Sequence, residues 1–355
     1  MKKRATILEF NRYHGEVLPS LVYFLNRFGF SVHVYVARDL LNRDPFAGLA
    51  HLDFKLMPID RHSFDTALWK GTLSAADVLV LNTFQPAETI EKFAEIEMPT
   101  LLVVHNGRDF SESESNRVFV RPRHREILVL APHVAAFLKK YDVDSTWIFP
   151  GLFASNSDES NGRDSGLRTF CVQGRVESKR RNYESVVIAA LNLKKEGFRN
   201  FSIKVLGKSD SREGRRLRWS TFSRGLGRYF SFSRSGVGYD QFNRELRSST
   251  FLCPLIDKVH GSYRAYFEDK ASSSIPAAVG NGIIPVIHED LAPIYGIGGC
   301  AITYGDRMLA EALRTALELS SLDISERQAE LGTIRAQFMA QSEENLKAAL
   351  NKVMG

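Results

Sequence analysis

Two patterns of apolar residues alternate along the first 150 residues of the chain. Short continuous apolar runs predict strands that are buried on both faces, and between them apolar residues recur every three or four positions, which predicts helices. The strands are expected over 6–10, 31–37, 54–59, 77–81, 100–105, 127–130 and 146–149, and the helices over 18–29, 64–74, 87–96 and 133–140. This alternation is typical of a parallel sheet covered by helices.

The alternation stops once and then starts again. Residues 155–166 have no apolar side chain and many turn formers, so we place a linker at 153–166, between a first domain at 1–152 and a second domain at 167–335. Strands then follow over 169–173, 201–207, 250–255, 283–288 and 301–304, and helices over 183–195, 240–248, 270–279 and from 307 onward. The sequence therefore predicts two doubly wound α/β domains that face a central cleft, where small molecules bind.

Composition narrows the class of protein. The 355 residues are 44% hydrophobic and 25% charged, as in globular proteins, and the formal net charge of +6 favours anionic ligands or an anionic membrane surface. The three cysteines, Cys171, Cys253 and Cys300, are too far apart in sequence for a CxxC zinc motif, and their odd number argues against a disulfide framework. No apolar run is long enough for a secretory signal or a spanning helix, so we expect a cytoplasmic protein, with contact at the inner face of the plasma membrane as an option.

The most informative motif follows the first strand of the second domain. That strand ends in Gly174-Arg175, and the cations Lys179, Arg180 and Arg181 precede the next helix. The glycine lets the backbone approach a ligand, and Arg175 with a neighbouring cation can hold a diphosphate at the helix N-terminus. The alternative is that these are solvated charges on a loop.

A second anion-binding candidate lies before the predicted helix at 270–279. Lys270, Ser272 and Ser273 bring a cation and two hydroxyls to one helix start, although a single serine there can also act only as an N-cap. Tyr263, on the preceding loop, either lines the cleft or packs in the core.

Polar residues also follow two strands of the first domain. His14 and Glu16 lie on the loop after the first strand, and His105 and Asp109 follow the strand at 100–105. Any of His14, Glu16 or Asp109 can serve as a general base, and each can equally be an ordinary loop residue.

The strand-Gly-Arg-Lys motif resembles the donor-phosphate motif of GT-B glycosyltransferases, in particular the retaining family 4-type enzymes built on two Rossmann-like domains. Residues 148–151, 203–207 and 280–287 are similar to further motifs of that family, in the same order. The chain has Gly-x-x-Pro from Gly282 to Pro285, as in exostosin-like transferases, and alanine in place of the glutamate that holds the donor ribose.

The resemblance implies specific roles. The second domain is expected to hold the donor, with Arg175, Lys179, Arg180, Lys270, Ser272 and Ser273 at the diphosphate and Gly174, Gly207, Tyr239, Tyr263 and Glu268 at the nucleoside or sugar. His105 is expected to contact the donor sugar, as a member of the catalytic set His105, Asp109, His14 and Glu16. Residues 336–355 are expected to form a helix that packs back on the first domain.

We therefore predict a metal-independent hexosyltransferase without a cofactor. It moves a sugar from a UDP- or GDP-linked donor to a glycan or lipid-linked acceptor, in bacterial-type surface polysaccharide synthesis, and the stereochemical outcome stays open. The alternatives are a nucleotide-sugar epimerase of the same fold, or an anion- or nucleic-acid-binding protein. The last would use the basic, aromatic stretch 208–234, which can also contact an anionic membrane or form a solvated helix.

Overall fold

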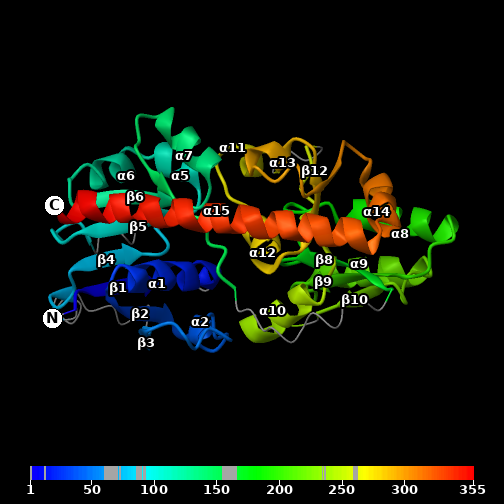
Figure 1. Cartoon of the computed structure of the whole chain (residues 1–355), viewed down its shortest axis with the longest axis horizontal. Helices are drawn as coiled ribbons and strands as arrows, with labels where there is room; N and C mark the ends of the chain where they lie inside the picture. Colours follow the sequence, from blue (N-terminus) through cyan, green and yellow to red (C-terminus); the bar gives the residue numbers. More distant parts are fainter. Residues whose placement is uncertain are drawn as a thin grey trace. The chain divides into compact units, whose positions relative to one another are not determined.

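The computed structural model of the chain describes residues 2–11, 13–59, 71, 73–84, 90, 93–153, 166–233, 235, 237–258 and 263–355. Residues 154–165 of the predicted linker and most of the predicted helices over 64–74 and 87–96 lie outside these residues. Contacts divide the chain into two compact units (Figure 1). Unit 1 comprises Met1–Leu152, Glu268–Ala271 and Gln337–Gly355, and unit 2 comprises Phe153–Phe267 and Ser272–Ala336.

Unit 1 is built on a seven-stranded parallel sheet, as its apolar runs predicted. Across the sheet the strands are β3 (Phe54–Ile59), β2 (Ser31–Ala37), β1 (Arg4–Glu9), β4 (Val78–Leu81), β5 (Thr100–Val104), β6 (Arg125–Val129) and β7 (Thr146–Trp147). Every residue of β4, β5 and β6 is buried, whereas β2 alternates between buried and half-buried positions. Central strands covered on both faces explain the continuous apolar runs.

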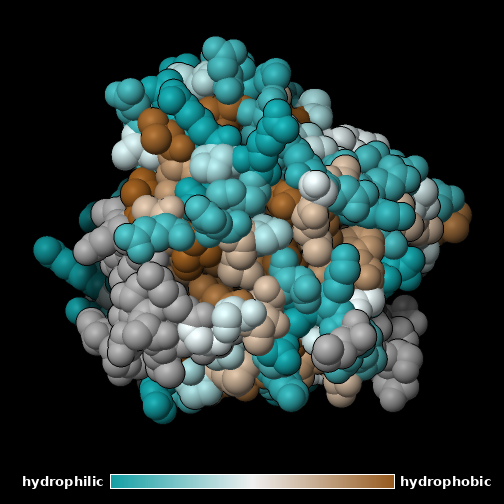
Figure 2. All heavy atoms as spheres, turned by 90° about the vertical axis from the view of Figure 1, so that its left-hand side faces the viewer, coloured by the Kyte–Doolittle hydropathy of each residue, from teal (hydrophilic) through white to brown (hydrophobic). Residues whose placement is uncertain are grey.

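The strand order of unit 1 reverses between β1 and β4. At such a reversal the loops after neighbouring strands diverge, and ligands of doubly wound sheets bind at the carboxyl edge there. The described helices of this unit are η1 (Gly15–Val17), α1 (Leu18–Arg27), α2 (Arg38–Leu41), α5 (Gly107–Ser111), α6 (Glu114–Phe119) and α7 (Pro132–Lys139). Hydrophilic residues cover much of the face of unit 1 drawn in colour in Figure 2, with hydrophobic residues between them.

Unit 2 has a six-stranded parallel sheet of the same kind. Its strands across the sheet are β10 (Phe230–Phe232), β9 (Phe201–Leu206), β8 (Arg168–Gln173), β11 (Phe251–Leu252), β12 (Ile284–His288) and β13 (Ile302–Tyr304), so the order reverses between β8 and β11. The helices are α8 (Tyr183–Lys195), α9 (Arg212–Ser223), α10 (Tyr239–Arg247), α11 (Ala265–Glu268), α12 (Ser274–Asn281), α13 (Leu291–Ile294), α14 (Leu309–Glu318) and the start of α15 (Ser321–Met354). All three cysteines are buried and free.

The segment Glu268–Ala271 differs from its prediction. It belongs to unit 1 rather than to the second domain, and the helix expected from Lys270 begins only at Ser274. The physical reason is a set of backbone contacts: Lys270 forms an antiparallel bridge with Asn106, and Gly107 N–H donates to Asp269 O at 2.8 Å. These contacts place Lys270 in a β-bridge, so the first turn of the predicted helix does not form.

The helical C-terminal region consists of two helices. Leu319 has an extended backbone (φ −59°, ψ 133°), which ends α14 and separates it from α15. The last part of α15 belongs to unit 1, where Ser342 Oγ accepts a hydrogen bond from Phe149 N–H at 2.8 Å and Asn345 Nδ2 donates to Trp147 O at 2.9 Å. The ring centroids of Phe338 and Phe149 are 5.0 Å apart. The helix therefore satisfies backbone groups at and after β7, which ends the sheet.

We predict that Ser342→Ala destabilises the protein by about 1–3 kcal/mol, because it leaves the buried Phe149 N–H without an acceptor. Ser325→Ala on the same helix is the matched control: its hydroxyl is exposed and bonds only to Ser321 O, so the change is expected to stay within about 0.5 kcal/mol. Denaturant unfolding measures both, and equal midpoints for the two variants would contradict the role of Ser342.

Candidate functional site

Three polar residues meet at the carboxyl edge of unit 1, where the strand order reverses. Glu9 ends β1, Asn82 follows β4 and His105 follows β5. Glu9 is fully buried, and its carboxylate accepts hydrogen bonds from Asn82 Nδ2 at 2.5 Å, from Thr83 Oγ1 at 2.7 Å and from Asn11 N–H. Burial raises the pKa of Glu9 to about 7, although these three donors oppose the shift. This carboxyl changes charge near neutral pH.

His14 and His105 form a stacked pair beside Glu9. Their ring centroids are 3.8 Å apart, and Asn82 Nδ2 donates to His14 O at 3.0 Å. His105 Nε2 lies 2.7 Å from Asn82 O, which can only accept, so this nitrogen carries the proton and Nδ1 is left as an acceptor. Some surface of His105 is exposed, but the dense packing around its ring lowers its pKa to about 4. His105 is therefore neutral at physiological pH.

The other predicted residues of unit 1 occupy different positions. Glu16 lies in η1 and Asp109 in α5, where the carboxylate of Asp109 accepts a hydrogen bond from Asn106 Nδ2. Glu268 is ion-paired to Arg108 at 3.0 Å, and Lys270 lies in the bridge to Asn106. The structure thus gathers His14 and His105 and ties Asp109 to the N-cap of α5.

The carboxyl edge of unit 2 depends on two glycines. Gly174, directly after β8, has φ +98°, and Gly207, directly after β9, packs on it so closely that an added Cβ would lie 1.7 Å from Gly174 O. The Tyr183 hydroxyl donates to Gly174 O and Arg175 O, at 3.3 Å each. Backbone packing therefore fixes the path of the Gly174-Arg175 turn.

One predicted cation of unit 2 is buried and the others are exposed. Arg175 and Arg180 are exposed and both pair with Glu177, at 3.2 and 2.8 Å, and Lys179 is exposed too. Arg181 is only 7% exposed: its guanidinium lies against Gly174 and donates to Ser274 Oγ at 3.2 Å, at the start of α12. Within the part of the chain that the structure describes, Arg181 has no carboxylate partner and its Nε has no hydrogen bond.

A buried guanidinium without a counter-ion is costly, because burial removes water from a charge. Arg181 lies at the carboxyl edge of β8 beside a glycine and the N-terminus of α12, where a bound anion would supply the missing charge. The side chain of Gln173 also faces this region, since its Nε2 lies 3.4 Å from Ser273 Oγ. Sequence reasoning placed Arg181 in the cation cluster but left it out of the chosen set, because no pattern in the loop shows which cation is buried.

The remaining predicted residues of unit 2 are packed rather than open. Tyr263 is fully buried and its hydroxyl donates to Ser178 O at 2.8 Å, and burial raises its pKa. Tyr239 begins α10 and is 8% exposed. Ser272 is buried, and its N–H donates to the Tyr295 hydroxyl at 2.8 Å. The part of the loop at 259–262, beside Tyr263, lies outside the described residues.

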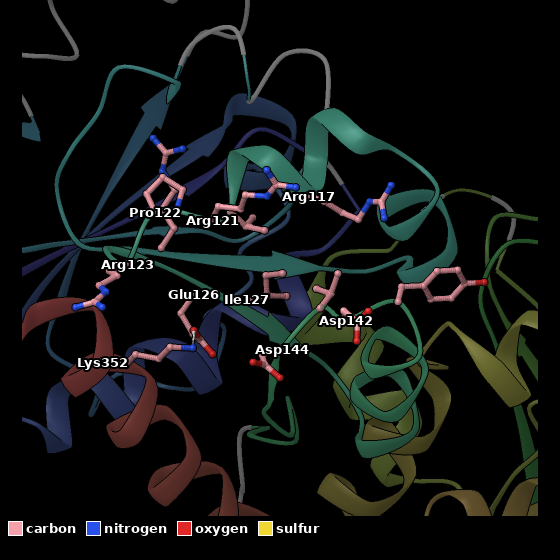
Figure 3. Close-up of a pocket in the computed structure, with 13 residues that line it drawn as sticks. Arg117, Arg121, Pro122, Arg123, Glu126, Ile127, Asp142, Asp144 and Lys352 are labelled. Atoms are coloured by element: carbon pink, nitrogen blue, oxygen red, sulfur yellow. Dashed lines mark ion pairs between the residues drawn. The ribbon is translucent and has the colours of Figure 1, made fainter.

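A separate pocket of about 410 Å³ lies in unit 1 (Figure 3). It is lined by Arg117, Arg121, Arg123 and Asp142, together with the ion pair of Lys352 and Glu126. These residues surround the start of β6 and precede β7, so the pocket lies at the amino edge of the sheet and contains none of the predicted site residues. Among the described residues no group of three or more His, Cys, Asp or Glu side chains has the arrangement of a metal site, and no helix is long and apolar enough to cross a membrane.

Comparisons with known proteins were made by sequence and by structure. No protein-family model matches the chain, and no curated protein matches it. Among solved structures, WaaG, a glycosyltransferase involved in lipopolysaccharide biosynthesis, matches with a TM-score of 0.60 and 14% identity over 99% of this chain and 100% of its own. HepE of Anabaena in complex with UDP has a TM-score of 0.65 and 13% identity over 97% and 100% of the two chains.

A trehalose-phosphate synthase (UDP-forming) from Burkholderia vietnamiensis matches with a TM-score of 0.61 and 12% identity, over 100% of this chain and 99% of its own. At such low identity the likeness establishes the fold. The chain has the GT-B glycosyltransferase fold, two α/β domains each with a parallel sheet, and this confirms the predicted fold class.

We predict that Glu9→Gln changes how stability depends on pH. The folded protein retains a proton at Glu9 up to about pH 7, whereas the unfolded chain releases it near 4.5, so the contribution of Glu9 to stability is present at low pH and is lost as pH rises through this window. Between these pH values the free energy of unfolding of the wild type should fall by about 3 kcal/mol more than that of the variant. Urea unfolding across this pH range measures it. The exposed Glu326→Gln is the control, and parallel curves for wild type and Glu9→Gln would contradict the role of Glu9.

We predict that Gly207→Ala destabilises the protein by about 1–3 kcal/mol or more, because its Cβ would overlap Gly174 O and displace the turn. Gly332→Ala is the control. Gly332 lies inside α15 with nothing within 4 Å of an added Cβ, so alanine there is expected to stabilise by up to about 1 kcal/mol. Thermal or denaturant unfolding that ranks the two variants in the opposite order would show that the backbone contact is unimportant.

Proposed function

We propose that the protein is a glycosyltransferase that moves a sugar from a nucleotide diphosphate sugar to an acceptor. The observation that carries this proposal is Arg181, a buried guanidinium with no carboxylate partner among the described residues, held against the Gly174 turn and the start of α12. We propose that the donor diphosphate binds at Arg181, where its negative charge would pair with the buried guanidinium. Support also comes from the fold, since structures of HepE contain UDP, UDP with glucose, or UDP-glucose.

The proposed diphosphate site lies in unit 2. In this proposal the buried Arg181 contacts the phosphates from the protein interior. The exposed Arg175 contacts them from the surface once its ion pair with Glu177 has opened. In the transfer, the bond between the anomeric carbon and the diphosphate oxygen breaks and the acceptor oxygen bonds to that carbon. The leaving diphosphate gains negative charge, which these two cations stabilise, and we propose that they do so in place of a metal ion.

Unit 1 supplies the polar groups for the sugar and the acceptor in this proposal. Neutral His105 offers Nδ1 as a hydrogen-bond acceptor for a sugar hydroxyl, and its low pKa makes it a weak base. His14 and Glu16 are the candidate bases for the proton of the acceptor hydroxyl. Glu9 orients His14 indirectly, because it binds Asn82, which in turn donates a hydrogen bond to His14 O.

We further propose a hexose donor linked to UDP or GDP and a glycan or lipid-linked acceptor in surface polysaccharide synthesis. The likeness to WaaG, which acts in lipopolysaccharide biosynthesis, supports this choice of acceptor. A lipid-linked acceptor would bring a cytoplasmic enzyme to the inner face of the plasma membrane.

Nucleotide binding tests the proposal. UDP or GDP at a hundred times its dissociation constant should stabilise the protein by about 2.7 kcal/mol in thermal unfolding. Arg175→Ala should weaken that binding about tenfold or more through loss of a charge-assisted contact, and Arg181→Gln should weaken it further. Circular dichroism checks that Arg181→Gln folds.

The control is Arg199→Ala, an exposed arginine of unit 2 whose hydrogen bonds among the described residues go to the nearby carbonyls of Lys194 and Phe198. It should bind nucleotide like the wild type. Product analysis with a labelled donor then shows whether the sugar is transferred, or is altered without an acceptor as by an epimerase. No stabilisation by any nucleotide, or full binding by both Arg175→Ala and Arg181→Gln, would overturn the proposal.

A further inference from the structure

Helix α9 of unit 2 presents a surface that the proposed transfer reaction does not use. One side of the helix is buried through Gly214, Leu217 and Thr221, and a Cβ on Gly214 would lie only 2.3 Å from Ser209 O. Ser211 caps the helix by accepting a hydrogen bond from Gly214 N–H at 3.1 Å. These contacts fix which side of the helix faces inward, so the opposite side faces solvent.

The opposite side of the helix carries two aromatic rings and three cations. We call these five residues the α9 face: Arg212, Arg215, Arg216, Trp219 and Phe222. Helical periodicity places these positions together, opposite the buried stripe. Trp219 is 67% exposed and Phe222 is 69% exposed, and their ring centroids are 6.2 Å apart. Single exposed apolar side chains are ordinary, but an adjacent aromatic pair in a cationic setting is characteristic of an interaction surface.

Among the described residues, the arginines of the α9 face are not paired with carboxylates. The only acid of the helix, Glu213, accepts a hydrogen bond from Ser178 N–H, and Arg215 bonds to the backbone carbonyl of Asp210 at 2.7 Å. Within the described residues, none of the three arginines of the face forms an ion pair with a carboxylate. Arg224 and Arg228, just after the helix, are also exposed. The positive charge is therefore available to a partner.

We infer that the α9 face docks the protein on an anionic lipid bilayer. An amphipathic helix lies flat on a membrane when aromatic rings insert among the headgroups and arginines reach the lipid phosphates, with their apolar stems beside the rings. A single-stranded nucleic acid would instead need a positively charged groove, whereas this face is the convex side of one helix. The role of this surface rests on the proposed function, because membrane binding would give the enzyme access to a lipid-linked acceptor. Lipid binding itself does not depend on sugar transfer and can be tested separately.

Vesicle sedimentation tests the inference with the full chain. Vesicles of phosphatidylcholine with phosphatidylglycerol should bind the protein, vesicles of phosphatidylcholine alone should bind it weakly, and high salt should release it. The double variant Trp219→Ser/Phe222→Ser should weaken vesicle binding about tenfold or more, because it removes the apolar surface that inserts among the headgroups. Arg212→Gln with Arg216→Gln should weaken it about thirtyfold.

Matched controls come from elsewhere on the chain. Leu322→Ser removes an apolar side chain that is 68% exposed on α15, and Arg199→Gln removes an exposed cation, and both should bind vesicles like the wild type. Brominated phosphatidylglycerol should quench the fluorescence of Trp219 on binding, and Trp219→Phe should abolish that part of the signal.

The outcomes separate this inference from the proposed function. Equal binding to both vesicle types, wild-type binding by the double variants, or tight retention on RNA in place of vesicles would overturn the lipid surface. So would a dimer that the aromatic double variant disrupts, because the face would then be covered by a second copy. Stabilisation by UDP without vesicle binding would refute the α9 inference alone, and vesicle binding without nucleotide binding would refute the proposed function alone.

Discussion

The close approach of two strand ends in unit 2 is the constraint on which the candidate donor site depends. Gly207 leaves no room for a side chain against the carbonyl of Gly174, and Gly174 has a positive φ that only glycine adopts at low cost. This packing turns the chain so that Arg181 is buried beside the turn and beside Ser274. The backbone thus holds a cation at a position where no described residue supplies a carboxylate partner.

Unit 1 uses a different physical principle at its carboxyl edge. There buried polar groups bind one another: Glu9 accepts a hydrogen bond from Asn82, and Asn82 binds both histidines through its side-chain nitrogen and its carbonyl, while Asn82 Oδ1 has no partner among the described residues. These hydrogen bonds fix the orientation of the side chains that they join. The same burial makes Glu9 titrate near neutral pH and keeps His105 uncharged.

Central strands such as β4 and β5 were predictable because burial on both faces leaves a continuous apolar run. The half-buried strands β2 and β3 were also predicted with their observed limits. Helix α8 was predicted with its observed limits for the equivalent reason. The helix predicted from Lys270 begins only at Ser274, because contacts with Asn106 and Gly107, distant in sequence, hold Asp269 and Lys270 in a turn and a β-bridge. The short helices α5 and α6 gave no periodic signal of useful length.

The sequence by itself determined the alternation of strands and helices, the two sheets and the position of the Gly-Arg turn, since these follow from local apolar spacing and turn residues. Only the tertiary structure decided which charges are buried. Arg181 and Arg180 are neighbours in sequence, yet one is enclosed and the other is exposed, and Glu9 looked like the end of an ordinary strand. Burial depends on segments brought together by folding, and it is burial that sets the electrostatics of a site.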